Sequence, residues 1–203
     1  VKLLDANQDL SIQVHPDDEY GLRVEGEYGK NEMWLILEND PGSIIYYGVN
    51  EPLTKEVFRA SIEDNTILDK LHSVETKPYD FFYMPAGTIH ALGKGNVIAE
   101  VQQSSNSTYR IYDFERRDAQ GNLRELHIDK AVDVSDLTPI EYEPVELDGQ
   151  ITELIKNQYF YTRLVKVRGS RKLEATDQSF QALVVVKGNG VLVDGLQQYE
   201  LKQ

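Results

Sequence analysis

Alternation of polar and apolar residues is the feature that most constrains the fold of this chain. Residues 10–15 alternate in this way, and residues 32–37 are interpreted similarly, with Met33, Leu35 and Leu37 on the face opposite Glu32, Trp34 and Ile36. A repeat of two places successive side chains on opposite faces of a β-strand. Further strands are predicted from β-branched and aromatic content at 43–48, 81–84, 97–102 and 108–114. Many short strands separated by turns predict a mainly β fold, either an antiparallel β-barrel or a double-sheet jelly roll.

One stretch has helical periodicity instead. Thr54 is a candidate N-cap, and the apolar residues after it are spaced for one helical face: Val57, Phe58 and Ile62. A second short helix is predicted over Ile67, Leu68 and Leu71, and a third begins near Ile128. We therefore expect a small helical insertion at 54–72, packed on the outside of the barrel.

The second half of the chain differs in composition from the first. Acidic residues and two prolines, Pro139 and Pro144, predict a linker at 139–150. We expect one domain at 1–138 and a partial second β-domain at 151–203, with strands at 158–167 and 180–187. A glycine turn at 188–190 precedes a last apolar run. Because the chain begins at Val1 inside an apolar segment and stops one hairpin after this turn, we expect it to be truncated at both ends.

Charge and composition exclude several classes of protein. The chain has 21 basic and 34 acidic residues and a net charge of −13, which argues against binding to nucleic acid or to an anionic membrane surface. No apolar run approaches the ~18 residues that span a bilayer, and the start lacks a signal-peptide pattern. There is no cysteine, which excludes disulfides and thiolate zinc sites. We expect a cytoplasmic protein.

Two of the four histidines stand in places suited to metal binding. Gln13 and His15 share one face of a predicted strand, His90 ends a turn that runs into another strand, and Glu32 begins a third. Two imidazoles, a carboxylate and an amide oxygen suit zinc, with manganese, iron or cobalt as competitors. The alternative is that each histidine is merely hydrogen-bonded or at the surface and that Glu32 is a solvated carboxylate. Spacing alone leaves both interpretations open.

Four motifs that occur in order carry a resemblance to a known family. They are Ile-Gln-Val-His-Pro-Asp-Asp at 12–18, Gly-Lys-Asn-Glu-Met-Trp at 29–34, Pro-Ala-Gly-Thr-Ile-His-Ala-Leu at 85–92 and Asn-Ser-Thr-Tyr-Arg at 106–110. Together they resemble type I mannose-6-phosphate isomerase (phosphomannose isomerase) of the cupin superfamily, in its short bacterial form. The resemblance covers residues 1 to about 140 well and the remainder loosely.

The resemblance implies a fold, a metal centre and a reaction. The fold would be a cupin-type antiparallel β-barrel. One zinc ion per chain would be held by His15, Glu32 and His90, with Gln13 as a further amide ligand. The reaction would interconvert mannose 6-phosphate and fructose 6-phosphate through a cis-enediol, with the metal acting as a Lewis acid. The substrate would be a small sugar phosphate.

The same resemblance implies catalytic roles for three residues. Arg110 matches the family's catalytic arginine, Lys30 matches a lysine connected with ring opening or proton transfer, and Glu100 matches a glutamate proposed as the base. Gly29 stands where many long forms have histidine, and the segment 102–105 also differs from those forms. The base therefore stays open between Glu100 and Lys30. A structural ion pair between Glu100 and Arg110 or Lys30 is the alternative, and no phosphate-binding residue is assigned.

Two other functions compete with the isomerase. The first is a non-catalytic metal-holding cupin that binds sugar or acts in regulation. The second is an iron-dependent cupin dioxygenase. The motifs that contain Lys30 and Arg110 argue against the dioxygenase, because dioxygen chemistry does not require them.

Overall fold

The computed structural model describes residues 1–147 and 149–203. The chain divides into two compact units, Val1–Leu164 and Val165–Gln203. The predicted linker at 139–150 and second domain at 151–203 stay a prediction. No helix in the described part of the chain is long and apolar enough to cross a membrane.

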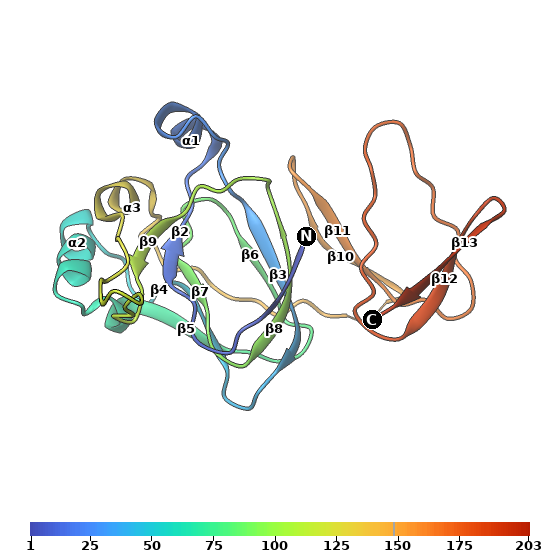
Figure 1. Cartoon of the computed structure of the whole chain (residues 1–203), viewed down its shortest axis with the longest axis horizontal. Coiled ribbons are helices and arrows are strands. Elements are labelled where there is room, and N and C mark those ends of the chain that lie inside the picture. Colours follow the sequence, from blue (N-terminus) through green and yellow to red (C-terminus); the bar gives the residue numbers. More distant parts are fainter. Residues whose placement is uncertain (148) are drawn as a thin grey trace. The chain divides into compact units, whose positions relative to one another are not determined.

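The first unit contains two antiparallel sheets that face each other (Figure 1). One sheet has four strands in the order β1 (Lys2–Asp5), β8 (Asn96–Gln102), β3 (Glu32–Asn39) and β6 (Phe81–Met84). The other has five strands in the order β5 (Leu71–Glu75), β4 (Ile44–Val49), β7 (His90–Leu92), β2 (Ile12–Val14) and β9 (Tyr109–Tyr112). This arrangement confirms the predicted mainly β, antiparallel fold.

Alternation along the strands fills the space between the two sheets. Trp34 and Ile36 of β3 belong to one buried cluster with apolar residues of both sheets, including Phe82, Ile45 and Leu92. Since side chains two apart share a face, Glu32 lies on the same inward face as Trp34. The pattern that predicted the strands therefore also directs Glu32 into the barrel.

The outer face of the five-stranded sheet is covered by helices. Here Ile12 and Val14 cluster with Phe58 and Ile62 of α2 (Lys55–Glu63) and with buried residues of α3 (Ile128–Val134). Thr54 is the N-cap of α2, as predicted, and its hydroxyl accepts a hydrogen bond from the Val57 amide at 3.3 Å. A short 3₁₀ helix, η1 (Ile67–Lys70), follows. The predicted helical insertion outside the barrel is thus confirmed up to Lys70, whereas Leu71, which was predicted to be helical, begins β5.

The outer face of the four-stranded sheet is covered by a hairpin. This hairpin consists of β10 (Ile151–Lys156) and β11 (Tyr161–Val165). Its Leu154 is buried with Met33 and Leu35 of β3. Each sheet therefore has one face toward the barrel interior and one face covered from outside, which explains why β3 is apolar at five consecutive positions, 33–37.

Several elements were not predicted, and one prediction was wrong. The unpredicted elements include β1, β5, β10 and the seven-residue helix α1 (Asp18–Val24). Residues 180–187 were predicted to form a strand, but they have no regular secondary structure, and Phe180 is 88% exposed. In the second unit the strands are β12 (Asn189–Asp194) and β13 (Gln197–Lys202), which form an antiparallel hairpin. Residues 180–187 have a high strand propensity but pair with no described strand, so they do not form one.

Candidate metal centre

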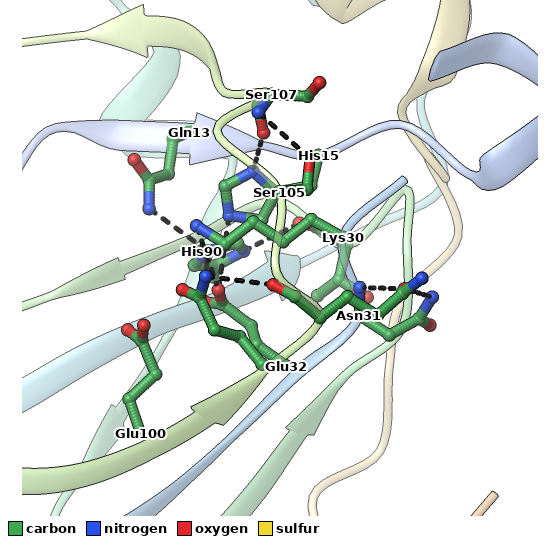
Figure 2. Close-up of polar contacts among 12 residues, drawn as sticks. Gln13, His15, Lys30, Asn31, Glu32, His90, Glu100, Ser105 and Ser107 are labelled. Atoms are coloured by element: carbon green, nitrogen blue, oxygen red, sulfur yellow. Dashed lines mark hydrogen bonds and ion pairs between the residues drawn. The ribbon is translucent and has the colours of Figure 1, made fainter. Parts of the chain in front are cut away.

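The three predicted metal ligands come from three different strand ends. His15 directly follows β2, Glu32 begins β3 and His90 begins β7. Gln13 is the register partner of His90, which brings β2 and β7 together at this point. In Figure 2 the two imidazoles and the carboxylate point toward one another. Residues far apart in the sequence therefore meet inside the barrel, as predicted.

The ligand atoms of these residues converge closely. Nε2 of His90 lies 3.0 Å from Oε1 of Glu32, and Nε2 of His15 lies 3.4 Å from Oε2 of the same carboxylate. One ligand atom from each residue lies within 4.8 Å of the other two. All three residues are at most 2% exposed. A single ion with bonds of about 2.0–2.2 Å can reach all three atoms.

The opposite nitrogen of each imidazole is held by the backbone. Nδ1 of His15 lies 2.9 Å from the carbonyl oxygen of Ser107, and Nδ1 of His90 lies 2.9 Å from that of Thr88. A carbonyl only accepts, so each Nδ1 must carry the proton and donate. The lone pair of each ring is then on Nε2, directed at Glu32. Metal-binding histidines are oriented by such acceptors.

Several atoms at the centre of this group have no hydrogen-bonding partner. Within the described part of the chain these are Nε2 of His15 and both carboxylate oxygens of Glu32. A buried polar atom without a partner costs about 1–3 kcal/mol, and a buried charge costs more. A divalent cation would offset this cost for all of these atoms at once. The residues present therefore fit a metal ion.

The protonation states favoured by the site are those of metal ligands. Burial lowers the pKa of His15 to about 4. Burial opposes ionisation of Glu32, but the two neighbouring histidines hold the pKa of its carboxyl well below its ordinary value. A neutral imidazole and an ionised carboxylate are the forms that bind a metal ion.

Lys30 and Gln13 border the same group. The buried ammonium of Lys30 lies 3.4 Å from Oε2 of Glu32. The amide nitrogen of Gln13 lies 3.4 Å from Nε2 of His90. The oxygen and nitrogen of a side-chain amide are assigned from their surroundings. A flip of the Gln13 amide would therefore place its oxygen, instead of its nitrogen, toward the site.

Arg110 lies on the neighbouring strand and shares the inward face. Gln13 is the register partner of both His90 and Arg110. Nη1 of Arg110 donates to the carbonyl oxygen of Glu125 at 2.8 Å, and the buried Nε of Arg110 has no partner in the described part of the chain. Burial, followed by the charge of Arg124, lowers the pKa of Arg110 from its ordinary value.

Glu100 is held by a residue that sequence reasoning missed. It is the register partner of Trp34 and is 5% exposed. Nζ of Lys2, on β1, lies 2.8 Å from its Oε1 and also donates to Gln102 at 2.7 Å. The expected alternative partners were Arg110 and Lys30. The ion pair of Lys2 with Glu100 depends on the pairing of β1 with β8, and β1 is too short to be recognised from its pattern.

Comparison with known proteins adds an independent observation. No protein-family model matches the chain. A mannose-6-phosphate isomerase of Bacillus subtilis is 41% identical over 209 residues, which include 100% of this chain and 65% of that protein. One from Streptococcus mutans is 42% identical over 206 residues, with the same coverage. The chain belongs to the family of these mannose-6-phosphate isomerases. It spans about 65% of their length.

Solved structures of mannose-6-phosphate isomerases share the fold. The crystal structure of the enzyme from Bacillus subtilis is similar with a TM-score of 0.88 at 36% identity, over 99% of this chain and 65% of that one. A mannose 6-phosphate isomerase bound with zinc and yttrium has a TM-score of 0.67 at 17% identity, over 98% of this chain and 71% of that one. The barrel is therefore the cupin-type barrel of this isomerase family.

Proposed function

We propose that this chain carries the metal centre and catalytic groups of an aldose–ketose isomerase that interconverts mannose 6-phosphate and fructose 6-phosphate. The observation that carries the proposal is the convergence of His15, Glu32 and His90, in which Nε2 of His15 and both carboxylate oxygens of Glu32 have no hydrogen-bonding partner among the described residues. The names of the relatives supply the substrate class. The inward positions of Lys30, Arg110 and Glu100 favour this reaction over a non-catalytic metal-holding cupin.

The metal in this proposal is zinc. Two imidazoles and one carboxylate form a common zinc ligand set that leaves coordination positions open for a substrate. A structural neighbour is described as bound with zinc. His15, Glu32 and His90 would hold the ion, and the amide of Gln13 is a candidate fourth ligand. When bound, the ion supplies a Lewis acid that stabilises negative charge on the oxygens at C1 and C2 of the open-chain sugar.

The chemistry requires one proton to move between two carbons. A base removes the proton from C2 of mannose 6-phosphate and returns it to C1, while a hydroxyl proton moves from O2 to O1. The atoms balance, and no oxidant or reductant is needed. We assign the base to Glu100, whose carboxylate is oriented by the ion pair with Lys2.

Two cations would assist the same transfer. Arg110 carries a permanent charge and would stabilise the enediolate that develops when the C2 proton leaves. Lys30 is a buried donor beside Glu32, and we assign it to hydrogen bonding with the sugar oxygens during ring opening.

A coupled assay for fructose 6-phosphate formation tests the proposal. The chain is depleted of metal with a chelator and then reloaded with one equivalent of zinc. We expect turnover of mannose 6-phosphate to vanish on depletion and to return on reloading. A chain that binds the metal and the sugar phosphate but never forms fructose 6-phosphate would instead support the non-catalytic cupin.

A further inference from the structure

The loop that follows β8 contacts two of the three segments that carry metal ligands, those of His15 and Glu32. This loop, residues 103–107, overlaps the segment in which the sequence departs from the long forms of the family. It lies beside the metal centre, and two of its residues, Ser105 and Ser107, are drawn in Figure 2. The contacts of this loop connect the sequence difference with the support of the metal ligands.

Gln103 fixes the residue that precedes Glu32. Its backbone amide donates to the carbonyl oxygen of Asn31 at 3.0 Å. Its side-chain Oε1 accepts from the Asn31 backbone amide at 2.8 Å and from Asn31 Nδ2 at 2.7 Å. The buried Asn31 also accepts at Oδ1 from Tyr83 and from the Ala86 amide, each at 3.1 Å. Asn31 is thus held from both sides, which leaves the adjoining Glu32 little freedom to move.

The other end of the same side chain reaches the segment after His15. Nε2 of Gln103 donates to Oδ1 of Asp18 at 3.0 Å. That oxygen also accepts from the Gly29 amide at 2.9 Å. Asp18 begins α1, three residues after His15. One amide side chain therefore connects the His15 segment with the Glu32 segment.

Two residues further along, the loop also orients His15. The buried hydroxyl of Ser105 donates to the carbonyl oxygen of Tyr28 at 2.7 Å and accepts from the Ser107 amide at 3.1 Å. The carbonyl of Ser107 then accepts from Nδ1 of His15. Gln103 stands at the start of this loop, so a change there alters the support of both ligands.

We propose that Gln103 is a positioning residue for the metal centre. Its amide donates to Asp18 and accepts from Asn31, and this pair of contacts sets the separation of His15 and Glu32. The proposal rests on the metal centre proposed above. Substitution of a group that hydrogen-bonds to a metal ligand and orients it typically weakens metal affinity by 10- to 100-fold.

The test uses Gln103→Glu in the full chain. Glutamate keeps an acceptor for Asn31 but loses the donor to Asp18 and places two carboxylates together. We expect the dissociation constant for Co²⁺ to rise about tenfold, and the visible spectrum of the bound Co²⁺ to change. General electrostatics predicts the opposite, because an added negative charge attracts a cation. Gln120→Glu, the same change in an exposed loop, is the matched control and should bind Co²⁺ as the parent chain does.

A second substitution exchanges donor and acceptor. Asp18→Asn alone keeps Oδ1 for both of its hydrogen bonds and should change Co²⁺ affinity little. In the double variant Gln103→Glu/Asp18→Asn the new Nδ2 can donate to the new carboxylate. We expect the double variant to regain most of the lost affinity and the parent spectrum. Rescue of this kind is not expected from a general loss of stability, which thermal unfolding of the metal-free chains measures separately.

Each outcome decides between the two proposals. Unchanged Co²⁺ affinity in Gln103→Glu, or a double variant no better than Gln103→Glu, would overturn the positioning role and leave the metal centre intact. A parent chain that binds no Co²⁺ would overturn the metal centre itself, and the role of Gln103 with it.

Discussion

Nε2 of His90 lies 3.0 Å from Oε1 of Glu32, although the two residues begin strands of different sheets. Both side chains are 1% exposed. Burial of a carboxylate among neutral imidazoles is unfavourable unless another charge compensates it. The ammonium of Lys30, 3.4 Å from Oε2 of Glu32, compensates part of this charge, and a bound metal ion would compensate it further.

Arg110→Ala should separate metal binding from turnover. The guanidinium is proposed to stabilise charge that develops in the transition state, and it is not a metal ligand. We expect zinc content to stay at one ion per chain while kcat falls roughly 100- to 1,000-fold, the usual effect of losing one such donor. Metal analysis and steady-state kinetics on the same preparation measure both quantities. Loss of zinc together with activity would contradict the assigned role.

Glu100→Gln should also retain the metal. Glutamine keeps the shape of the side chain and an acceptor for Lys2, but it cannot take a proton from carbon. We expect kcat to fall about 100- to 10,000-fold, as is typical when a general base is removed. If exchange of the C2 proton with solvent persists at the parent rate in this variant, Glu100 is not the base and Lys30 becomes the candidate.

Gly29→Ala should destabilise the chain and weaken the metal centre. An added Cβ would lie 2.3 Å from the carbonyl carbon of Asp17 and 2.6 Å from the Asp18 amide nitrogen. Overpacking of this kind costs roughly 1–3 kcal/mol or more. Chemical unfolding should show the loss, and Gly190→Ala, where a Cβ meets no atom within 4 Å, should not. This close approach explains why the position that holds histidine in many long forms is glycine here.

Phe58→Ala tests the packing of α2 on the barrel. Phe58 is fully buried in the cluster between the five-stranded sheet and the helices. Its removal should lower the free energy of unfolding by about 3–5 kcal/mol. Phe180→Ala, at a side chain that is 88% exposed, should change it by less than about 0.5 kcal/mol. Equal effects in urea unfolding would contradict the described core.

Elements with a clear local pattern were predicted from the sequence, and very short elements were not. The repeat of two along β3 and the N-cap at Thr54 are local patterns, and both elements were predicted. The strand β1 and the helix α1 are four and seven residues long. Such lengths are too short for a repeat to stand out, although the Asp17 cap could have indicated α1.

Contacts between distant residues were harder to predict. The motifs brought His15, Glu32 and His90 into one hypothesis because of a family resemblance, not because of their spacing. The ion pair of Lys2 with Glu100 and the bonds between Gln103 and Asn31 join residues with no local pattern in common. Their partners are set by strand register, which only the structure gives. The roles assigned to Lys30, Arg110, Glu100 and Gln13 stay predictions.

Metal binding by the chain tests the central claim most directly. Metal-free protein is titrated with zinc against a competing chromophoric chelator. We expect one ion per chain for the parent and for His72→Ala, since His72 lies outside the ligand group, and no tight binding for His90→Ala. Equal zinc affinity in His90→Ala and the parent chain would contradict the account.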